Sequence, residues 1–267
     1  MRCLLAAAMA GAAALCPATA DAQTAPSPHA DTTVEASTGI AYQQGTYGLH
    51  TDIELLSSTA ALKITHGGFS VAASLPYVRL TAPANVVTGG GLLGLPIIVP
   101  PTPSTERRSR DGIGDLRLAA GYTVTTLPVG FTVSAEVKLP TASAAKGIGT
   151  GKTDLAVGGE LFKTIGRVTP YLDIAYTMPG QPEGYRLDDS LSGQLGAAVQ
   201  LGRRVRGHLA YAYAEALSPA LGDQQAVTGG VNFGLSRNLT LGMYGSAGLS
   251  RGAPDMVAGL RLGLRVD

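Results

Sequence analysis

The chain has 267 residues, and only 15% of them are charged, whereas a soluble domain has about 25%. Its formal net charge is +1, and it has neither the basic patch nor the acidic tail that would point to a nucleic-acid partner. Beyond the first 22 residues, no apolar run is long enough for a membrane-spanning helix. The composition is therefore too apolar for a soluble surface and too interrupted for helical spans.

The first 22 residues have the features of a secretory signal peptide, because Arg2 is followed by an apolar run and small residues precede Gln23. Cys3 and Cys16 both lie within this segment. The mature chain then has no cysteine, which excludes disulfides and cysteine metal sites. Residues 23–32 are polar and contain proline, so we predict that they form a periplasmic N-terminal tail.

Residues 33–267 contain twelve stretches in which apolar and polar residues alternate, the period that places successive side chains on opposite faces of a strand. Most are about ten residues or longer, which is the length that a tilted strand needs to cross a bilayer. The predicted strands cover residues 33–44, 48–65, 69–82, 115–124, 131–139, 152–164, 167–178, 189–202, 204–216, 223–235, 237–249 and 254–266.

The second predicted strand changes its facing part-way along. Ile53 and Leu55 lie on one parity, whereas Leu62 and Ile64 lie on the other. We predict a β-bulge near residues 56–58, because an extra residue there would restore the facing.

The lengths of the connections alternate along the chain. Those after the third, fifth, seventh and ninth strands are long, whereas those after the second, fourth, sixth, eighth and tenth strands are tight turns; short connections at 45–47 and 250–253 are the exceptions. Outer-membrane barrels have an even number of strands, short periplasmic turns and longer external loops. The sequence therefore predicts an all-β fold, a transmembrane antiparallel up-and-down β-barrel of about 12 strands with both termini in the periplasm.

In a barrel, the polar parity of each strand faces the lumen, because a lysine or arginine that faces lipid near the midplane costs about 2–4 kcal/mol. The resulting lumen has charges of both signs, which suits either internal ion pairs that hold a narrow barrel in shape or a permeation path. Arg206, Arg261 and Arg265 are the best candidates for an anion-attracting patch. The predicted lumen-lining residues are Asp52, Glu54, Lys63, Asp115, Arg117, Glu136, Lys138, Asp154, Glu160, Asp173, Arg206, His208, Arg261 and Arg265.

Residues 83–111 form a long connection rich in glycine and proline, which we do not expect to contain a regular strand. Its middle, from Val86 to Val99, is apolar, although external loops are normally polar. It either folds into the mouth, as a constriction or a capture site for an apolar substrate, or packs on the barrel rim or in lipopolysaccharide. The constriction candidates are Leu92, Leu93, Leu95, Ile97 and Ile98.

Motifs for catalysis or metal binding are weak. Residues 147–153 resemble a phosphate-binding loop, but Lys146 replaces the first glycine and no helix follows, so we predict a turn-forming loop. We predict no metal site and no cofactor, because the four histidines, His29, His50, His66 and His208, lack metal-ligand spacing. Twelve-stranded outer-membrane phospholipases exist, so a lipid hydrolase with a serine near a histidine remains an alternative.

Several short stretches share a pattern along the chain: Gly112 to Leu116, Lys138 to Thr141, Gly147 to Gly151 before Asp154, Thr169 to Tyr171 with Tyr176, and Ser250 to Asp255. Together they resemble one known family, the outer-membrane transporters named for the meta pathway of phenol degradation. The resemblance covers roughly residues 33 to 267. It implies a barrel in a Gram-negative outer membrane, reached after secretion across the inner membrane, that takes up aromatic or other apolar compounds.

Two features depart from most outer-membrane barrels. The chain ends at Asp267, where such barrels usually carry the aromatic residue that the barrel assembly machinery reads, so assembly with this partner could be less efficient. Aromatic residues are also few, without tryptophan. The interfacial girdles would consist of residues such as Tyr42, Tyr77, Tyr122, Tyr176 and Tyr213.

We therefore expect a channel or diffusion transporter, embedded in outer-membrane lipid, for small and aromatic or apolar molecules. It would not be an enzyme and would bind no nucleic acid. A structural or adhesion barrel with a closed lumen is the main alternative, because side chains can fill much of a barrel of this strand number.

Overall fold

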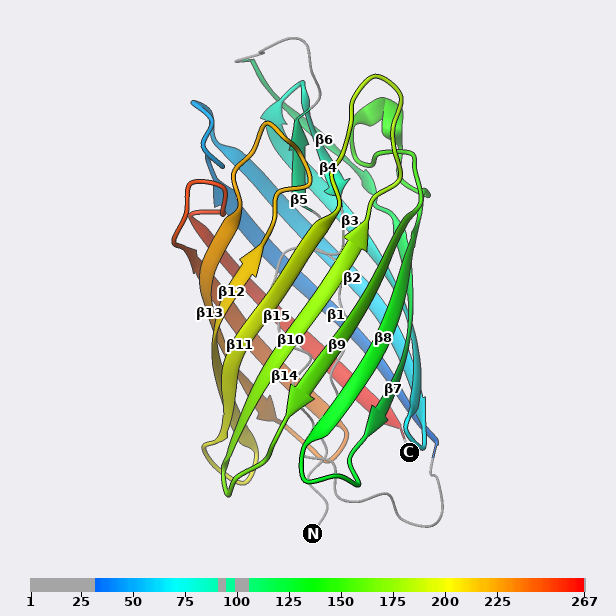
Figure 1. Ribbon diagram of the computed structural model, residues 1–267, viewed down its shortest axis with the longest axis vertical. Helices are drawn as coiled ribbons and strands as arrows, with labels where there is room; N and C mark the ends of the chain where they lie inside the picture. The colour runs from blue at the N-terminus through cyan, green and yellow to red at the C-terminus, as the bar shows by residue number, and fades with distance from the viewer. Residues whose placement is uncertain (1–31, 91–94, 99–105, 267) are drawn as a thin grey trace.

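The computed structural model describes residues 32–90, 95–98 and 106–266 (Figure 1). The predicted signal peptide (1–22), the tail except Thr32, and the constriction candidates Leu92 and Leu93 lie outside these residues. The single helical segment described is a 3₁₀ turn, η1, at Ala144–Lys146. No described helix is long and apolar enough to cross a membrane.

The sheet contains β1 (Thr32–Gly45), β2 (Ile53–His66), β3 (Phe69–Pro83), β6 (Arg107–Ile113), β7 (Leu116–Val124), β8 (Gly130–Leu139), β9 (Asp154–Phe162), β10 (Val168–Met178), β11 (Ser190–Gln200), β12 (Val205–Ala214), β13 (Gln224–Gly234), β14 (Leu239–Gly248) and β15 (Met256–Val266). A separate hairpin is formed by β4 (Val86–Gly90) and β5 (Leu95–Ile98). The strands lie within a few residues of their predicted ranges.

The sheet closes on itself. Consecutive strands pair antiparallel around the sheet, and β1 pairs with β15 from Val34↔Val266 to Gln44↔Met256. Twelve strands form the wall, because β6 and β7 together occupy one position beside β3. The predicted all-β antiparallel barrel is confirmed.

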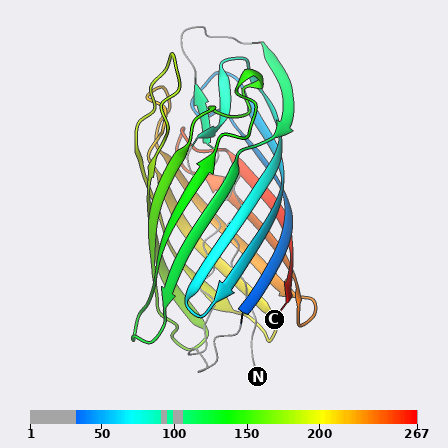
Figure 2. The same ribbon diagram turned by 90° about the vertical axis from the view of Figure 1, so that its right-hand side faces the viewer.

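The two ends of the barrel differ. Long connections and the β4–β5 hairpin lie at the upper end in both views, which we name the mouth end (Figure 1, Figure 2). The short turns lie at the opposite end, which we name the base end, where β1 begins and β15 finishes. The alternation of short and long connections therefore separates the ends as the sequence indicated.

The 83–111 connection corrects one prediction, because it contains regular strands. Strands β4 and β5 pair with each other within it, and at its end residues 107–113 form β6, which pairs with β3 from Tyr77↔Ile113 to Pro83↔Arg107. Every residue of this stretch except Ile113 is charged, glycine or serine, so apolar periodicity could not reveal it. The strand lengthens the wall of the barrel beyond the apolar band, where polar side chains meet water.

Between β6 and β7 the wall contains an irregularity. The pairs Tyr77↔Ile113 and Ser74↔Arg117 leave two residues of β3 between them but three residues on the opposite strand, which is a β-bulge. Gly114 N still donates to Pro76 O, at 2.8 Å. The bulge turns Asp115 to the interior, where it is 4% exposed.

The predicted bulge in β2 is wrong. Strand β2 pairs with β1 without interruption, from Thr32↔His66 to Gly45↔Ile53. Ile53 and Leu55 face the interior of the barrel, and Leu62 and Ile64 face outward. The parity of the apolar residues changes because the interior itself is apolar near the mouth.

The outer wall is an apolar surface. Exposed large side chains occur on most of the strands, among them Val133, Val157, Leu195, Leu209 and Leu260. Three tyrosines mark the mouth end of this surface: Tyr77 donates to Asp111, Tyr176 to Asp189 Oδ2 at 2.7 Å, and Tyr213 to Asp223 Oδ2 at 2.8 Å. A tyrosine with an apolar ring and a polar tip suits a membrane interface, as the predicted girdle requires.

The orientation of the wall predicts the effect of a charge on it. Leu209, midway along β12, is 63% exposed on the outer wall, so Leu209→Arg should lower the free energy of unfolding in lipid vesicles by about 2–4 kcal/mol. Leu127→Arg, in the β7–β8 connection at the base end, should cost only about 0–1 kcal/mol. Denaturant titration of both variants measures the difference, and equal losses would contradict a lipid-facing position for Leu209.

Candidate functional site

Apolar side chains gather inside the mouth end. Ile53 and Leu55 from β2, and Val78 and Leu80 from β3, face inward and are 5% exposed or less. Because the interiors of transmembrane barrels are generally polar, this position is unusual. We name the group the mouth cluster; it consists of Tyr47, Ile53, Leu55, Val78, Leu80, Ala82, Val86, Ala142 and Ile148.

The β4–β5 hairpin supplies part of this cluster. Val86 is fully buried in it, and Val87 pairs with Ile97, which is also fully buried. The structure thus places this connection in the mouth, which is one of the two predicted positions. Of the remaining constriction candidates, Leu95 and Ile98 belong to β5.

Two sets of hydrogen bonds tether the hairpin. Arg110 of β6 donates to Val86 O at 2.6 Å and to Pro83 O at 3.2 Å. On the other side, Thr88 N donates to Gly147 O at 3.4 Å, and Thr88 Oγ1 donates to Ile148 O at 3.2 Å. The hairpin is therefore attached both to the wall and to the β8–β9 connection.

Tyr47 closes the cluster from the β1–β2 connection. It is 1% exposed, and Gln43 Nε2 donates to its hydroxyl. Burial raises the pKa of the Tyr47 phenol, so the hydroxyl stays protonated. Tyr47 has a positive φ of 52°, a conformation that a side chain rarely adopts, so the packing and this hydrogen bond hold a strained residue in place.

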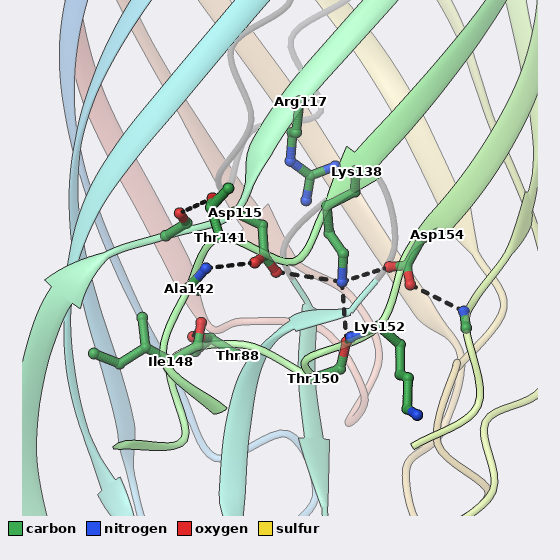
Figure 3. A network of polar contacts seen from close by, with 12 residues as sticks. Thr88, Asp115, Arg117, Lys138, Thr141, Ala142, Ile148, Thr150, Lys152 and Asp154 are labelled. Carbon is green, nitrogen blue, oxygen red and sulfur yellow. Dashed lines mark hydrogen bonds and ion pairs between the residues drawn. The ribbon is translucent and has the colours of Figure 1, made fainter. Parts of the chain in front are cut away.

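A buried charge network lies next to the mouth cluster (Figure 3). Lys138 Nζ lies 2.9 Å from Asp154 Oδ2 and 3.3 Å from Asp115 Oδ2, and it donates to Thr150 Oγ1 at 3.1 Å. The three charged side chains are 1–3% exposed. We name Asp115, Lys138, Thr150 and Asp154 the lysine network.

The network joins strands to loops. Asp115 Oδ1 accepts from Ala142 N at 2.9 Å, and Asp154 Oδ1 accepts from Gly180 N at 3.0 Å. Asp115 lies immediately before β7, Lys138 lies in β8 and Asp154 begins β9, so the network connects this part of the wall to the β8–β9 and β10–β11 loops. Since Ile148 of the same β8–β9 loop packs in the mouth cluster, the network and the hairpin are mechanically linked.

The glycine-rich sequence of the β8–β9 loop allows this arrangement. Gly147 terminates η1 with a φ of 66°, and the side chain of Ser143 caps the turn by accepting from Lys146 N. A Cβ on Gly149 would lie 2.7 Å from that of Ala142 and 3.1 Å from Asp115 Oδ2. Glycine is needed there because the loop passes so close to the buried carboxylate.

Three of the stretches that carry the family resemblance meet at the lysine network. Asp115 belongs to Gly112–Leu116, Lys138 to Lys138–Thr141, and Thr150 to Gly147–Gly151, which is followed by Asp154. The sequence indicated three of these residues as separate lumen charges, without Thr150 and without their pairing. The signal that could have linked them is that each charge lies at the mouth end of neighbouring strands.

Further along the lumen, other predicted residues form pairs. Arg117 Nη1 lies 2.8 Å from Glu136 Oε1, and both side chains are below 10% exposed. Arg261 lies 3.5 Å from Glu35, a lumen residue that the sequence analysis missed although it shares the polar parity of its strand. Arg265 donates to Thr33 Oγ1 at 3.1 Å. Within the predicted anion-attracting patch, the charge of Arg261 is therefore balanced by Glu35 of the wall.

The other candidates lie at separate points of the wall. Lys63 on β2, Glu160 on β9, and Arg206 and His208 on β12 share the inward parity of their strands. His208 pairs in register with Gly230, where an added Cβ would lie 2.6 Å from its ring. Asp173 also faces inward, from β10.

Two candidates do not face the lumen. Asp52 belongs to the β1–β2 connection, and Glu54 has outward parity, since Ile53 and Leu55 face inward. Glu54 Oε1 lies 2.6 Å from Arg107 Nη2 on the outer side of β6. The placement of both residues in the lumen rested on the β2 bulge, which is absent, so that placement was wrong.

Sequence comparison assigns the chain to a family. A family model described as "Putative MetA-pathway of phenol degradation" matches residues 24–266. The chain belongs to this family. The match confirms the resemblance found in the sequence, whereas no curated protein matches the chain.

Solved outer-membrane proteins have a similar fold. The COG4313 outer membrane channel from Pseudomonas putida F1 has 14% sequence identity and a TM-score of 0.62, and the match covers 90% of this chain and 97% of that one. The toluene transporter TbuX from Ralstonia pickettii has 12% identity and a TM-score of 0.44, with 90% of each chain covered. At 14% identity, the likeness to the COG4313 channel concerns the fold, an outer-membrane β-barrel.

The lysine network predicts a sharp effect of removing its cation. Lys138→Met in this family member leaves two buried carboxylates without their counter-charge, so the free energy of unfolding should fall by about 3–5 kcal/mol. Denaturant titration in detergent measures the loss. Lys146→Met, at an exposed lysine of the β8–β9 loop, is the matched control and should change stability little.

The triple variant Lys138→Met, Asp115→Asn, Asp154→Asn removes all three charges. It should recover much of the loss, because a neutral network leaves no unpaired charge. A Lys138→Met protein as stable as the control would contradict the buried ion pairs.

Proposed function

We propose that the protein is an outer-membrane channel for small apolar molecules, aromatic compounds included. The observation that carries the proposal is the mouth cluster, since an apolar surface at the entrance of a polar barrel provides a favourable environment for an apolar solute. The family, whose description names phenol degradation, and the outer-membrane barrel fold are consistent with it.

In this mechanism the solute first binds among the mouth cluster and the β4–β5 hairpin. It then passes into the lumen, where many inward positions carry small side chains, for example Ala210, Ala212 and Ala214 on β12. The pairs Arg117–Glu136 and Arg261–Glu35 reduce the net charge that a neutral solute meets. No cofactor takes part, and the base end, where β1 begins and β15 finishes, faces the periplasm.

A closed structural or adhesion barrel is the second candidate. The buried lysine network and the fully buried Val86 and Ile97 favour it, because both fill the mouth with packed side chains. The two candidates differ in whether the hairpin can leave its position. The lipid-hydrolase alternative has less support, since in the described part of the chain no serine hydroxyl is hydrogen-bonded to a histidine ring.

Single-channel recording tests the channel proposal. Val86→Asn buries an amide in the mouth cluster at a cost of about 1–3 kcal/mol. It should therefore raise the open fraction roughly 5- to 150-fold in planar bilayers. Ala84→Asn, at an exposed position just before the hairpin, should behave as the unmodified protein does.

A variant without residues 86–99 should show larger and steadier openings than either point variant. Phenol added on the mouth side should interrupt the current of the unmodified protein and have less effect on the deletion variant, which lacks part of the binding surface. No conductance in any of these proteins would contradict the channel proposal and favour the closed barrel.

A further inference from the structure

Basic side chains gather in the short turns at the base end of the barrel (Figure 1). The connections at this end are residues 67–68, 125–129, 163–167, 201–204 and 235–238, and none of them contains an aspartate or a glutamate. The last three contain lysine or arginine. We name these exposed basic side chains the base collar; it consists of Lys163, Arg167, Arg203, Arg204 and Arg237.

The connections at the mouth end have a different charge pattern. There, basic residues such as Lys146, Arg186 and Arg251 are accompanied by acidic residues, among them Asp52, Glu183, Asp188, Asp189, Glu215, Asp223 and Asp255. In the part of the chain that the structure describes, no ion pair involves a member of the base collar. The positive charge of the base end is therefore not balanced by acidic side chains of the base turns.

The three basic turns share a short sequence pattern, in which a large apolar residue, a small residue and an arginine follow one another. The pattern occurs as Ile-Gly-Arg at 165–167, Leu-Gly-Arg at 201–203 and Leu-Ser-Arg at 235–237. The turns connect β9 to β10, β11 to β12 and β13 to β14, and these six strands are neighbours in the sheet. Because adjacent strands are about 4.8 Å apart, equivalent positions of successive turns lie about 10 Å apart along the rim.

The apolar residue of each turn continues the lipid-facing surface. Ile165, Leu201 and Leu235 have the outward parity of β9, β11 and β13, and they are 61%, 60% and 50% exposed. Leu201 lies against the outer wall, since a Cβ added to Gly207 would be 3.1 Å from Leu201 Cδ1, and Gly207 has the same parity as the outward Leu209. The lipid-facing surface therefore extends as far as the turns.

An arginine two residues after such an apolar side chain lies at the level of the lipid headgroups. Its aliphatic stem can follow the apolar surface while its guanidinium reaches the polar layer. A guanidinium donates two parallel hydrogen bonds to phosphate oxygens, which makes arginine well suited to binding phosphate. A soluble acidic partner would have to cover the three exposed apolar side chains as well, whereas the lipid that surrounds the wall already covers them.

We propose that the base collar binds the phosphate groups of anionic phospholipids, one at each of the three turns. The positive charge favours a lipid with a net negative headgroup over a zwitterionic lipid, whose own cation the collar repels. In the orientation given under the proposed function, these lipids belong to the periplasmic leaflet of the outer membrane. Their binding holds the base end at a fixed depth in the bilayer.

Native mass spectrometry tests this proposal by counting the lipids that stay bound. The protein, refolded in a neutral detergent, is mixed with equal amounts of phosphatidylglycerol and phosphatidylcholine that have the same acyl chains. A basic residue at a membrane surface favours anionic lipid about fivefold, so phosphatidylglycerol should be bound in roughly that excess. The excess should fall as sodium chloride is added, because salt screens exposed charges.

The triple variant Arg167→Gln, Arg203→Gln, Arg237→Gln should lose most of the preference for phosphatidylglycerol. The matched control is Lys146→Gln, Arg186→Gln, Arg251→Gln, which removes the same charge from exposed positions at the mouth end and should keep the preference. Heat-dependent mobility in gel electrophoresis checks that each variant is folded.

Equal binding of the two lipids by the unmodified protein would overturn the proposal and favour an acidic protein as the partner of the collar. Equal losses of preference in the two triple variants would also contradict it. So would displacement of phosphatidylglycerol by an equal concentration of inorganic phosphate, since the turns would then bind the free ion. This readout depends neither on conductance nor on orientation, so the lipid site and the channel proposal succeed or fail separately.

Discussion

The structure depends on one constraint: within lipid, every backbone amide and carbonyl must find its partner inside the protein. The pairing of β1 with β15 meets it, since it removes the two free edges that an open sheet would leave. Once the sheet is closed, the alternation of side chains along each strand decides which residues face lipid and which face the lumen. Outward side chains meet lipid and are apolar, whereas inward side chains are free to vary along the barrel.

That freedom produces two different interiors in one barrel. Near the mouth, the inward positions of β2 and β3 are apolar and contact the β4–β5 hairpin. Beside them lies the lysine network, and deeper positions carry small or charged side chains. The network adds little to the net free energy of unfolding, but it constrains geometry. Any arrangement that separates a buried charge from its partner is strongly destabilised, so the groups stay in place. It fixes where the β8–β9 loop lies, and this loop in turn holds Thr88 of the hairpin.

The sequence predicted the barrel well because its strands are long and their lipid-facing parity is regular. It failed where that regularity ends. Strand β6 escaped notice because polar residues occupy both of its faces, and the supposed bulge in β2 arose from the assumption that the interior is polar throughout. The sequence identified each charge of the lysine network but not that the three charges contact one another. The spacing of residues along the chain determines neither the register between strands nor the path of a loop.

The three pairs Tyr77–Asp111, Tyr176–Asp189 and Tyr213–Asp223 have a consequence for the outer connections. Tyr176 and Tyr213 lie near the ends of β10 and β12, whereas Tyr77 lies in the middle of β3, and each aspartate lies in or immediately before the neighbouring strand. The pairs therefore fasten together the two stems of three long connections at the level of the membrane interface. Beyond the Tyr213–Asp223 clasp, the β12–β13 connection can diverge in length or sequence, or be exchanged in engineered proteins, without shifting the two strands that carry it. The other two connections also contact the wall, through the β4–β5 hairpin and through Gly180 of the β10–β11 loop.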